Sequence, residues 1–408
     1  MKKVYNLIFC LLLCVNLFAQ HGFPDGHYCN TEEGWKCKSC KALYGLKNDE
    51  KDKVIVIPHR GFWGAPGIPE TSLKAVQEAV TKKYMFCEID LIMTKDKKLL
   101  LFHDQQVDRC TNAPATFTNN GGNTDQGNFV RSMNYNSTTL NTVPNSFGTK
   151  YPTFPALKDL YYKDRLGTVT NQKITTYEEI LDYCANKDIV LTLDLKAVKI
   201  TDQTIRKEYL EAIKLIIEIA KQKKCLHQIV FKPGASGQVT VSEIKDYLTP
   251  YGLWDDFAKH TSLILINIVG SAFPLALDKA YLDAWLNLPS LIGVEHIYKS
   301  LDDPLLKPRS EFGNKSVVQY TRDKGIRIGV FHPTPTTLEG AANGRGGFYN
   351  PKNYGTLDDL RGSMEFLFSV PSKVYPGMIV TDRPDVDTEY LKVCKLVSKY
   401  TNSDFTPY

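Results

Sequence analysis

Ionisable side chains gather near the ends of several apolar runs in this sequence. The set contains two histidines, three carboxylates and two basic side chains: His59, Arg60, Glu88, Asp90, His103, Asp194 and Lys196. Glu88 and Asp90 stand two positions apart. The same spacing separates Asp194 from Lys196, and residues two apart on a strand point to the same face. If the runs are strands, each pair faces one cavity.

Three carboxylates in one cavity repel one another unless a cation lies among them. A hard divalent ion with oxygen ligands resolves that repulsion, which makes Glu88, Asp90 and Asp194 candidate metal ligands. Two imidazoles beside such an ion suit a general acid and a general base, a role for His59 and His103. Nearby basic side chains would offset the charge of a phosphate. The combination predicts metal-assisted cleavage of a phosphodiester.

Further residues complete this candidate site. Arg60 and Lys196 are candidates for phosphate binding, and Lys232, which ends another apolar run, is a third. Glu70 and Asp104 are expected to shape the site rather than to react. Each feature has an ordinary alternative, because a histidine after a strand is often structural and acidic or Asp-Lys pairs can be plain ion pairs. Their conjunction at strand ends is what favours chemistry.

Apolar strand-like runs alternate with amphipathic helical segments after residue 50. The predicted strands are residues 54–59, 85–93, 189–196, 228–232, 263–269, 291–297, 326–331 and 377–382. The predicted helices include residues 72–83, 176–186, 203–224, 275–287, 315–324 and 356–369. These eight β/α units predict a (β/α)8 TIM barrel, in which the carboxyl ends of the strands form one catalytic face.

One apolar run, residues 99–104, does not fit the alternation. Only the segment TKDKK separates it from the preceding strand, which is too short for a crossover to a parallel neighbour. We therefore expect this run to return antiparallel, as a β-hairpin at the barrel mouth.

The first residues of the chain predict export. In residues 1–20, two lysines precede a short apolar stretch and a small residue at a plausible cleavage point, which is typical of a signal peptide. The rival interpretation is an uncleaved anchor. The expected destination is the periplasm, the cell surface or the outside medium.

The rest of the chain divides into a small Cys-containing lobe over 21–50 and a barrel over 51–400. Cys29, Cys37 and Cys40 favour one local disulfide in the lobe. A polar insertion over 111–155 is expected at the barrel mouth, either as a lid or as a surface loop.

Composition limits the partners of this chain. Its formal charge is +5 without a lysine- or arginine-rich run, so nucleic acid is not expected as a partner. No later segment resembles a transmembrane helix, so stable membrane insertion is not expected either.

Several motifs together resemble the glycerophosphodiester phosphodiesterase family. They are HRG (59–61), PETSL (69–73), EIDLIMTKDKKLLLFHD (88–104), VDRCTN (107–112), LDLK (193–196) and VTDRP (380–384). The resemblance implies a phospholipase-C-like TIM barrel that hydrolyses a small glycerophosphodiester or lysophospholipid with a calcium or magnesium ion. The products would be sn-glycerol 3-phosphate and an alcohol. His59 and His103 would be the acid/base pair, Glu88 and Asp90 metal ligands, and Lys196 a phosphate ligand.

The sequence also departs from that family's pattern. The third metal ligand is commonly a glutamate in an ExK motif, whereas here it is the shorter Asp194. Thr71 replaces the usual asparagine of a PENT motif, and Phe331 stands where a tryptophan is often found. Arg60 either contacts the phosphate or pairs with Glu70 and shapes the loop.

Two rival functions stay open from the sequence. Phospholipase D toxins resemble this family and form cyclic phosphates from sphingolipids or lysophospholipids with a similar set of residues. A barrel that binds a ligand without turning it over is the second rival. Analysis of the reaction product separates the three.

Overall fold

The computed structural model describes most of the chain after the N-terminal segment. The described residues are 37–107, 109–113, 130–138, 155–196, 202–233, 239–269, 274–333, 361–369 and 375–405. The predicted signal peptide at 1–20 lies outside them, as do parts of the predicted insertion. The signal peptide therefore stays a prediction.

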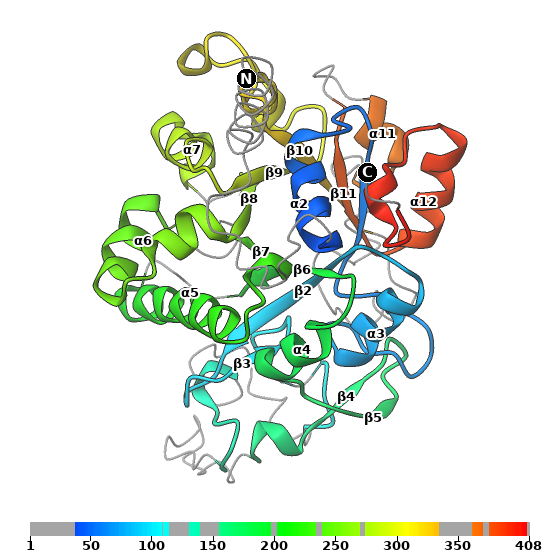
Figure 1. Ribbon diagram of the computed structural model, residues 1–408, viewed down its shortest axis with the longest axis vertical. Helices are drawn as coiled ribbons and strands as arrows, with labels where there is room; N and C mark the ends of the chain where they lie inside the picture. Colours follow the sequence, from blue (N-terminus) through cyan, green and yellow to red (C-terminus); the bar gives the residue numbers. More distant parts are fainter. Residues whose placement is uncertain are drawn as a thin grey trace, which may run out of the picture.

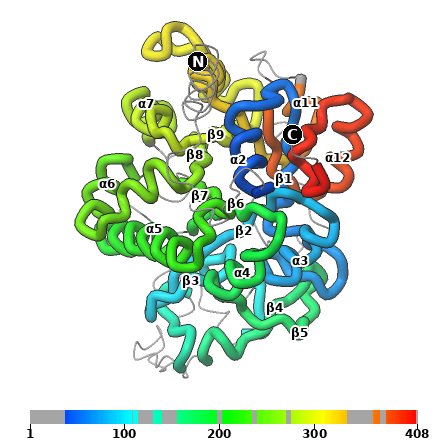
Figure 2. Tube along the Cα trace, viewed as in Figure 1, coloured from blue at the N-terminus to red at the C-terminus, as the bar shows by residue number. Residues whose placement is uncertain are grey.

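Eight parallel strands and one antiparallel strand form a single curled sheet. The parallel strands are β1 (Ile55–Pro58), β2 (Phe86–Met93), β6 (Val190–Leu195), β7 (Ile229–Lys232), β8 (Ser262–Ile268), β9 (Leu291–Ile297), β10 (Arg327–His332) and β11 (Met378–Thr381). Their order in space is β1-β11-β10-β9-β8-β7-β6-β2, so the first strand lies beside the last (Figure 2). Each of the eight predicted strands is present, and the predicted TIM barrel is confirmed.

Gly61 brings β1 and β2 together at the carboxyl end of the barrel. Its backbone N–H donates to the carbonyl of Glu88, with 2.8 Å between the nitrogen and the oxygen. Gly61 has a φ of +85°, and a Cβ atom there would lie 2.5 Å from the Cβ of Ala75. Only glycine allows both this backbone conformation and this close approach.

The predicted β-hairpin is confirmed. Strand β3 (Leu99–Leu101) pairs antiparallel with β2, with Leu101 opposite Leu91. Beyond the pairing, the N–H of Phe102 donates to the carbonyl of Asp90 over 3.1 Å. This bond places His103, the next residue, beside the acidic residues of β2.

Helices cover the outside of the barrel (Figure 1). They are α3 (Leu73–Thr81), α4 (Tyr177–Cys184), α5 (Gln203–Gln222), α6 (Val241–Leu248), α7 (Lys279–Leu286), α8 (Val317–Asp323), α11 (Met364–Ser369) and α12 (Pro384–Val393). Capping boxes start α4 and α6, in which Thr176 pairs with Glu179 and Thr240 with Glu243. The periodicity argument missed α6 and α12. Among the described residues, no helix combines the length and apolarity needed to cross a bilayer.

A two-stranded hairpin outside the barrel was not predicted. Strands β4 (Tyr161–Lys163) and β5 (Val169–Lys173) pair antiparallel next to the predicted insertion. Buried residues of the insertion, Val130 and Met133, join Tyr162 in a small apolar cluster against the β2–β3 hairpin. The described part of the insertion therefore packs on the barrel, although whether it acts as a lid stays open.

The predicted N-terminal lobe contributes a helix that seals the amino end of the barrel. Helix α2 (Lys38–Asn48) places Ala42, Leu43 and Leu46 against the inward apolar side chains of the strands. Figure 1 shows α2 lying across the strands. The Sγ atom of Cys37 caps α2 by accepting a hydrogen bond from the N–H of Cys40. Cys29 lies outside the described residues, so the local disulfide stays a prediction.

Arg327 anchors α2 to the barrel through hydrogen bonds. The side chain of this buried residue of β10 donates to the carbonyls of Gly45, Leu46 and Asp49 in the last turn of α2. It also donates to the carbonyl of Gly377, over 2.9 Å. Burial lowers the pKa of Arg327 to about 10, so the guanidinium stays charged at neutral pH. A single cation thus satisfies the free carbonyls of a helix C-terminus.

Replacing Arg327 by methionine should lower the free energy of unfolding by roughly 3 kcal/mol, because several buried carbonyls lose their donor. Urea denaturation measures the change. The control is Arg322→Met, which alters an exposed arginine on neighbouring α8 and should change the free energy by less than about 0.5 kcal/mol. Equal shifts for both variants would contradict the role assigned to Arg327.

Candidate active site

Three buried carboxylates meet between β2 and β6 at the barrel mouth. The strand register places Asp90 opposite Asp194, and Glu88 precedes Asp90 by two positions on the same face. One oxygen from each of the three lies within 4.8 Å of the others. Their exposed fractions are 1% for Glu88, 0% for Asp90 and 7% for Asp194. The structure therefore brings together the predicted acidic trio.

Lys196 partly compensates the charge of this trio. Its Nζ atom lies 2.9 Å from Oδ1 of Asp90 and 2.6 Å from Oδ2 of Asp194. Although burial opposes it, Lys196 lowers the pKa of Asp90 below its usual range. Glu88 makes no such contact with Lys196, and burial together with the charge of Asp90 raises its pKa to about 7.

The trio has free capacity for a cation. Oδ1 of Asp194 is buried and accepts no hydrogen bond, which is costly for a carboxylate oxygen. Burial and the negative charge of Asp90 raise the pKa of Glu88, so a further cation would favour its ionised form. An all-oxygen set with one unused buried acceptor fits a hard divalent ion such as Ca²⁺ or Mg²⁺. Glu88, Asp90 and Asp194 are therefore suited to bind such an ion.

His59 ends the first strand and is held at one ring nitrogen. Its Nδ1 atom lies 2.7 Å from Oδ1 of Asp382, which follows β11. The Nε2 atom lies 3.9 Å from Oε2 of Glu88. The ring of Phe331 packs edge-on against the imidazole, with 4.7 Å between ring centroids. The bond to Asp382 leaves Nε2 as the nitrogen that faces the acidic trio.

His103, which follows β3, is held in the same manner. Its Nδ1 atom lies 2.6 Å from Oδ1 of Asp104. Burial and the nearby charge of Arg60 lower the pKa of His103. Nε2 of His59 lies 3.9 Å from Glu88, and Phe102, the residue before His103, donates its N–H to the carbonyl of Asp90, so both imidazoles lie beside the trio. The two predicted acid/base residues therefore share one site.

Arg60 is directed toward carboxylates. Its φ of +57° turns the chain sharply after β1, and its N–H donates to Oε2 of Glu88 over 2.8 Å. Nη1 donates to Oε1 of Glu70 over 2.9 Å, and Nε lies 3.5 Å from Oδ2 of Asp90. Of the two predicted roles, the structure contains the pairing with Glu70. A contact to phosphate stays a prediction.

Lys232 lies deep in the barrel, where its partner is a carboxylate. Its Nζ atom lies 2.8 Å from Oε2 of Glu295 on β9, and both residues are buried. Although burial opposes it, Glu295 raises the pKa of Lys232, followed by Glu88. Lys232 therefore adds positive charge near the trio, and its predicted phosphate contact stays untested.

Sequence reasoning overlooked three residues that hold others in place. Asp382 binds His59, Glu295 binds Lys232, and Arg109 bridges Glu70 and Asp104. Asp382 directly follows β11, so applying the strand-end rule to the last strand would have found it. Glu295 stands out as an acid within an apolar buried strand. Arg109 carries no comparable signal beyond its place in the VDRCTN motif.

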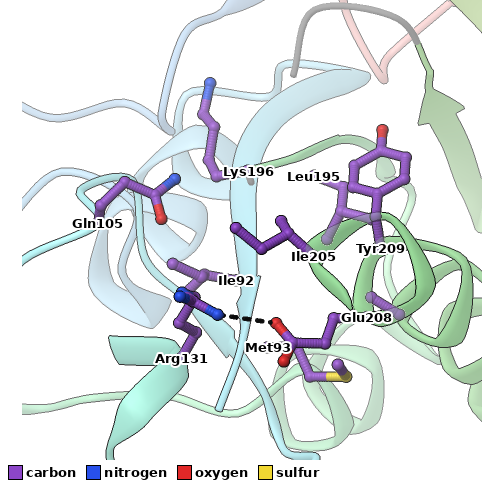
Figure 3. A pocket seen from close by; sticks show the side chains of 10 residues that line it. Ile92, Met93, Gln105, Arg131, Leu195, Lys196, Ile205, Glu208 and Tyr209 are labelled. Carbon is purple, nitrogen blue, oxygen red and sulfur yellow. Dashed lines mark hydrogen bonds and ion pairs between the residues drawn. The ribbon is translucent and has the colours of Figure 1, made fainter. Parts of the chain in front are cut away.

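A small pocket adjoins Lys196 (Figure 3). Apolar side chains of β2, β6 and α5, among them Ile92, Leu195 and Ile205, form much of its lining. Lys196 points away from these side chains in Figure 3. The volume is about 30 Å³, enough for water. The pocket therefore flanks the candidate site.

With this geometry established, the class of protein is defined by an α/β barrel with an acidic trio and two aspartate-bound histidines at its mouth. Two solved structures share the fold. A glycerophosphoryl diester phosphodiesterase from Parabacteroides distasonis superposes with a TM-score of 0.50 at 15% identity, covering 87% of this chain and 92% of its own. A protein from Silicibacter pomeroyi superposes with a TM-score of 0.51 at 16% identity, covering 87% and 98%.

Sequence comparison points to one family. Residues 59–246 match the model of the glycerophosphoryl diester phosphodiesterase family. Glycerophosphodiester phosphodiesterase of Bacillus subtilis is 41% identical over 61 residues, which is 15% of this chain and 20% of that protein. Glycerophosphodiester phosphodiesterase 1 of Bos taurus is 28% identical over 179 residues, 43% and 44% of the two chains. The chain thus spans less than half of either relative.

Thr71 replaces the usual asparagine of the PENT motif and binds one residue of the acidic trio. Its hydroxyl donates to Oδ2 of Asp90 over 3.0 Å. Its φ is +47°, a conformation that is costly for a β-branched residue and easier for asparagine. The site therefore keeps the hydrogen bond at the expense of backbone strain.

Thr71→Asn should raise the free energy of unfolding by about 1 kcal/mol, because asparagine relieves the strain and its amide can donate to Asp90. Urea denaturation measures the change. The control Thr71→Val keeps the shape and strain but loses the donor, and should lower the free energy by about 1–2 kcal/mol. An asparagine variant less stable than the wild type would refute the strain argument.

Proposed function

We propose that this protein hydrolyses glycerophosphodiesters to sn-glycerol 3-phosphate and an alcohol, with a divalent metal ion and two histidines. The observation that carries the proposal is the acidic trio lying beside two imidazoles, each bound at Nδ1 by an aspartate. The match of residues 59–246 to the model of the glycerophosphoryl diester phosphodiesterase family supports the substrate class.

Glu88, Asp90 and Asp194 would hold the ion. When bound, a divalent ion polarises a phosphoryl oxygen and stabilises the negative charge that develops there. The shorter side chain of Asp194, compared with the glutamate usual in the family, leaves more room for a water or a substrate oxygen. Either Ca²⁺ or Mg²⁺ suits oxygen ligands.

The phosphate group would bind next to Lys196. This lysine is the least buried of the three candidate phosphate ligands, with 16% of its side chain exposed against 4% for Arg60 and for Lys232. Its ammonium can turn from the carboxylates toward a substrate anion. Arg60 and Lys232 then contribute positive charge from behind the trio, and a direct phosphate contact by either would require release from its carboxylate.

The two histidines would move protons through their Nε2 atoms, because Nδ1 of each is bound to an aspartate. One imidazole removes a proton from the water molecule that attacks phosphorus, and the oxygen of this water becomes part of the released phosphate. The other protonates the oxygen of the leaving alcohol as the phosphorus–oxygen bond breaks. Burial and the charge of Arg60 lower the pKa of His103, which favours its neutral form and therefore a role as the base, with His59 then the acid.

The decisive experiment measures turnover of a panel of glycerophosphodiesters and of lysophosphatidylcholine. Chelation should abolish turnover and added Ca²⁺ or Mg²⁺ should restore it, whereas His59→Ala and His103→Ala should lose at least about 100-fold in kcat even with metal. Free glycerol 3-phosphate is the expected product. Cyclic phosphate would instead establish the phosphotransferase chemistry, and ligand binding without turnover would establish a binding protein.

Metal binding measured by calorimetry provides the control. Both histidine variants should bind the ion as the wild type does, because neither residue is a proposed ligand. Asp194→Asn should bind it at least about 10-fold more weakly, since a charged ligand is lost. Full activity of the histidine variants would remove the proposed mechanism.

We also propose that the protein is exported, on the basis of the residue pattern at 1–20. The chain purified from outside the cytoplasm should have lost these residues, which mass spectrometry of the intact protein checks. A protein that keeps Met1 and stays with the cytoplasm would overturn the proposal.

A further inference from the structure

Arg109 connects two parts of the candidate site that lie far apart in the sequence. Its Nε and Nη2 atoms donate to the two carboxylate oxygens of Asp104, and the Nη2–Oδ1 distance is 2.7 Å. Nη2 also donates to Oε1 of Glu70. This fork-shaped contact uses the planar geometry that only an arginine provides.

One branch of this contact leads to a proposed acid/base residue. Asp104, gripped at both oxygens by Arg109, lies 2.6 Å from Nδ1 of His103 through Oδ1. A carboxylate fixed in this way determines the orientation of the imidazole and the nitrogen that carries its proton.

The other branch leads to the acidic trio. Oε1 of Glu70 accepts from both Arg109 and Arg60, and Arg60 contacts Asp90 and, through its N–H, Glu88. The position of Arg60 therefore depends on a carboxylate that Arg109 holds.

Arg109 also keeps two carboxylates charged at close range. Glu70, His103 and Asp104 each place a potential ligand atom within 4.8 Å of the others. Burial would raise the pKa of Glu70, but the guanidinium groups of Arg109 and Arg60 lower it to about 2. Burial would also raise the pKa of Asp104, but the guanidinium of Arg109 lowers it. Without Arg109, these carboxylates would repel each other or take up a proton.

We propose that Arg109 is a positioning residue that sets the orientation of His103 through Asp104 and the position of Arg60 through Glu70. The proposal rests on the proposed function for its kinetic test, although the geometry of His103 can be measured without turnover. A guanidinium here aligns the catalytic imidazole relative to the phosphate-binding side of the site.

The test compares Arg109→Ala and Arg109→Lys with the wild type. Arg109→Ala should lower kcat about 10- to 100-fold with little change in KM, because alignment is lost while substrate contacts remain. Arg109→Lys should recover only part of the loss, since an ammonium group cannot hold Asp104 and Glu70 in one plane. Added ethylguanidinium should restore part of the turnover of the alanine variant.

The matched control is Arg206→Ala. Arg206 makes an equally forked contact, with both its Nε and its Nη2 atoms 2.6 Å from the carboxylate oxygens of Glu243, but it links α5 to α6. Its loss should leave kcat and KM at wild-type values. A general effect of removing a forked arginine would appear in both variants.

The ring-nitrogen NMR shifts of His103, assigned with His103→Gln, provide a readout that needs no substrate. These chemical shifts should change in Arg109→Ala and remain at their wild-type values in Arg206→Ala. The proposal is overturned if the His103 shifts are unchanged in Arg109→Ala or if this variant keeps wild-type turnover. It is also overturned if the loss of turnover is matched by a drop in melting temperature and ethylguanidinium does not restore activity. If the wild type turns over no diester, the proposed function fails and the NMR shifts alone decide the role of Arg109.

Discussion

Repulsion among the carboxylates at the barrel mouth is the constraint around which the surrounding residues are arranged. Glu88, Asp90 and Asp194 are held in place by the register of β2 and β6, so they cannot move apart. Their charge must be met by cations, and Lys196, which directly follows the strand that carries Asp194, meets part of it. Burial and the negative charge of Asp90 raise the pKa of Glu88 to about 7, so a further cation would favour its ionised form. A divalent ion is the simplest addition that would complete the balance.

Compensation of charge continues in the residues around the trio. The basic side chains around the trio are likewise shared between carboxylates or fixed by one: Arg60 by Glu70, Lys232 by Glu295, and Arg109 by Glu70 together with Asp104. Because basic and acidic side chains alternate in this network, each one is held in place by its neighbours. Moving one side chain would leave the charge of its buried partner without compensation. The two imidazoles lie at the edge of this arrangement, where Asp382 and Asp104 fix their Nδ1 atoms.

The sequence was sufficient for the barrel, and the reason is physical. Buried parallel strands are near-continuous apolar runs, and the short TKDKK connection allowed only an antiparallel return for residues 99–104. Because strand ends converge in a barrel, His59, Glu88 and Asp194 could be placed together. The β4–β5 hairpin was missed because β5 alternates exposed and half-buried polar residues, without an apolar face to detect.

Contacts between distant residues were beyond such reasoning. Asp382 is 323 positions from its partner His59, so the strand-end rule could place it at the barrel mouth without identifying that partner. The pairing of Arg60 with Glu70 was one of two predicted roles, and the positive φ of Arg60 that accompanies it has no signal in the sequence. The first strand completes the sheet only by pairing with the last, and His59 on that strand finds its aspartate only there. The bond that orients the His59 ring therefore needs β11 in place, so a nascent chain that lacks its C-terminal strand has no oriented imidazole at this position.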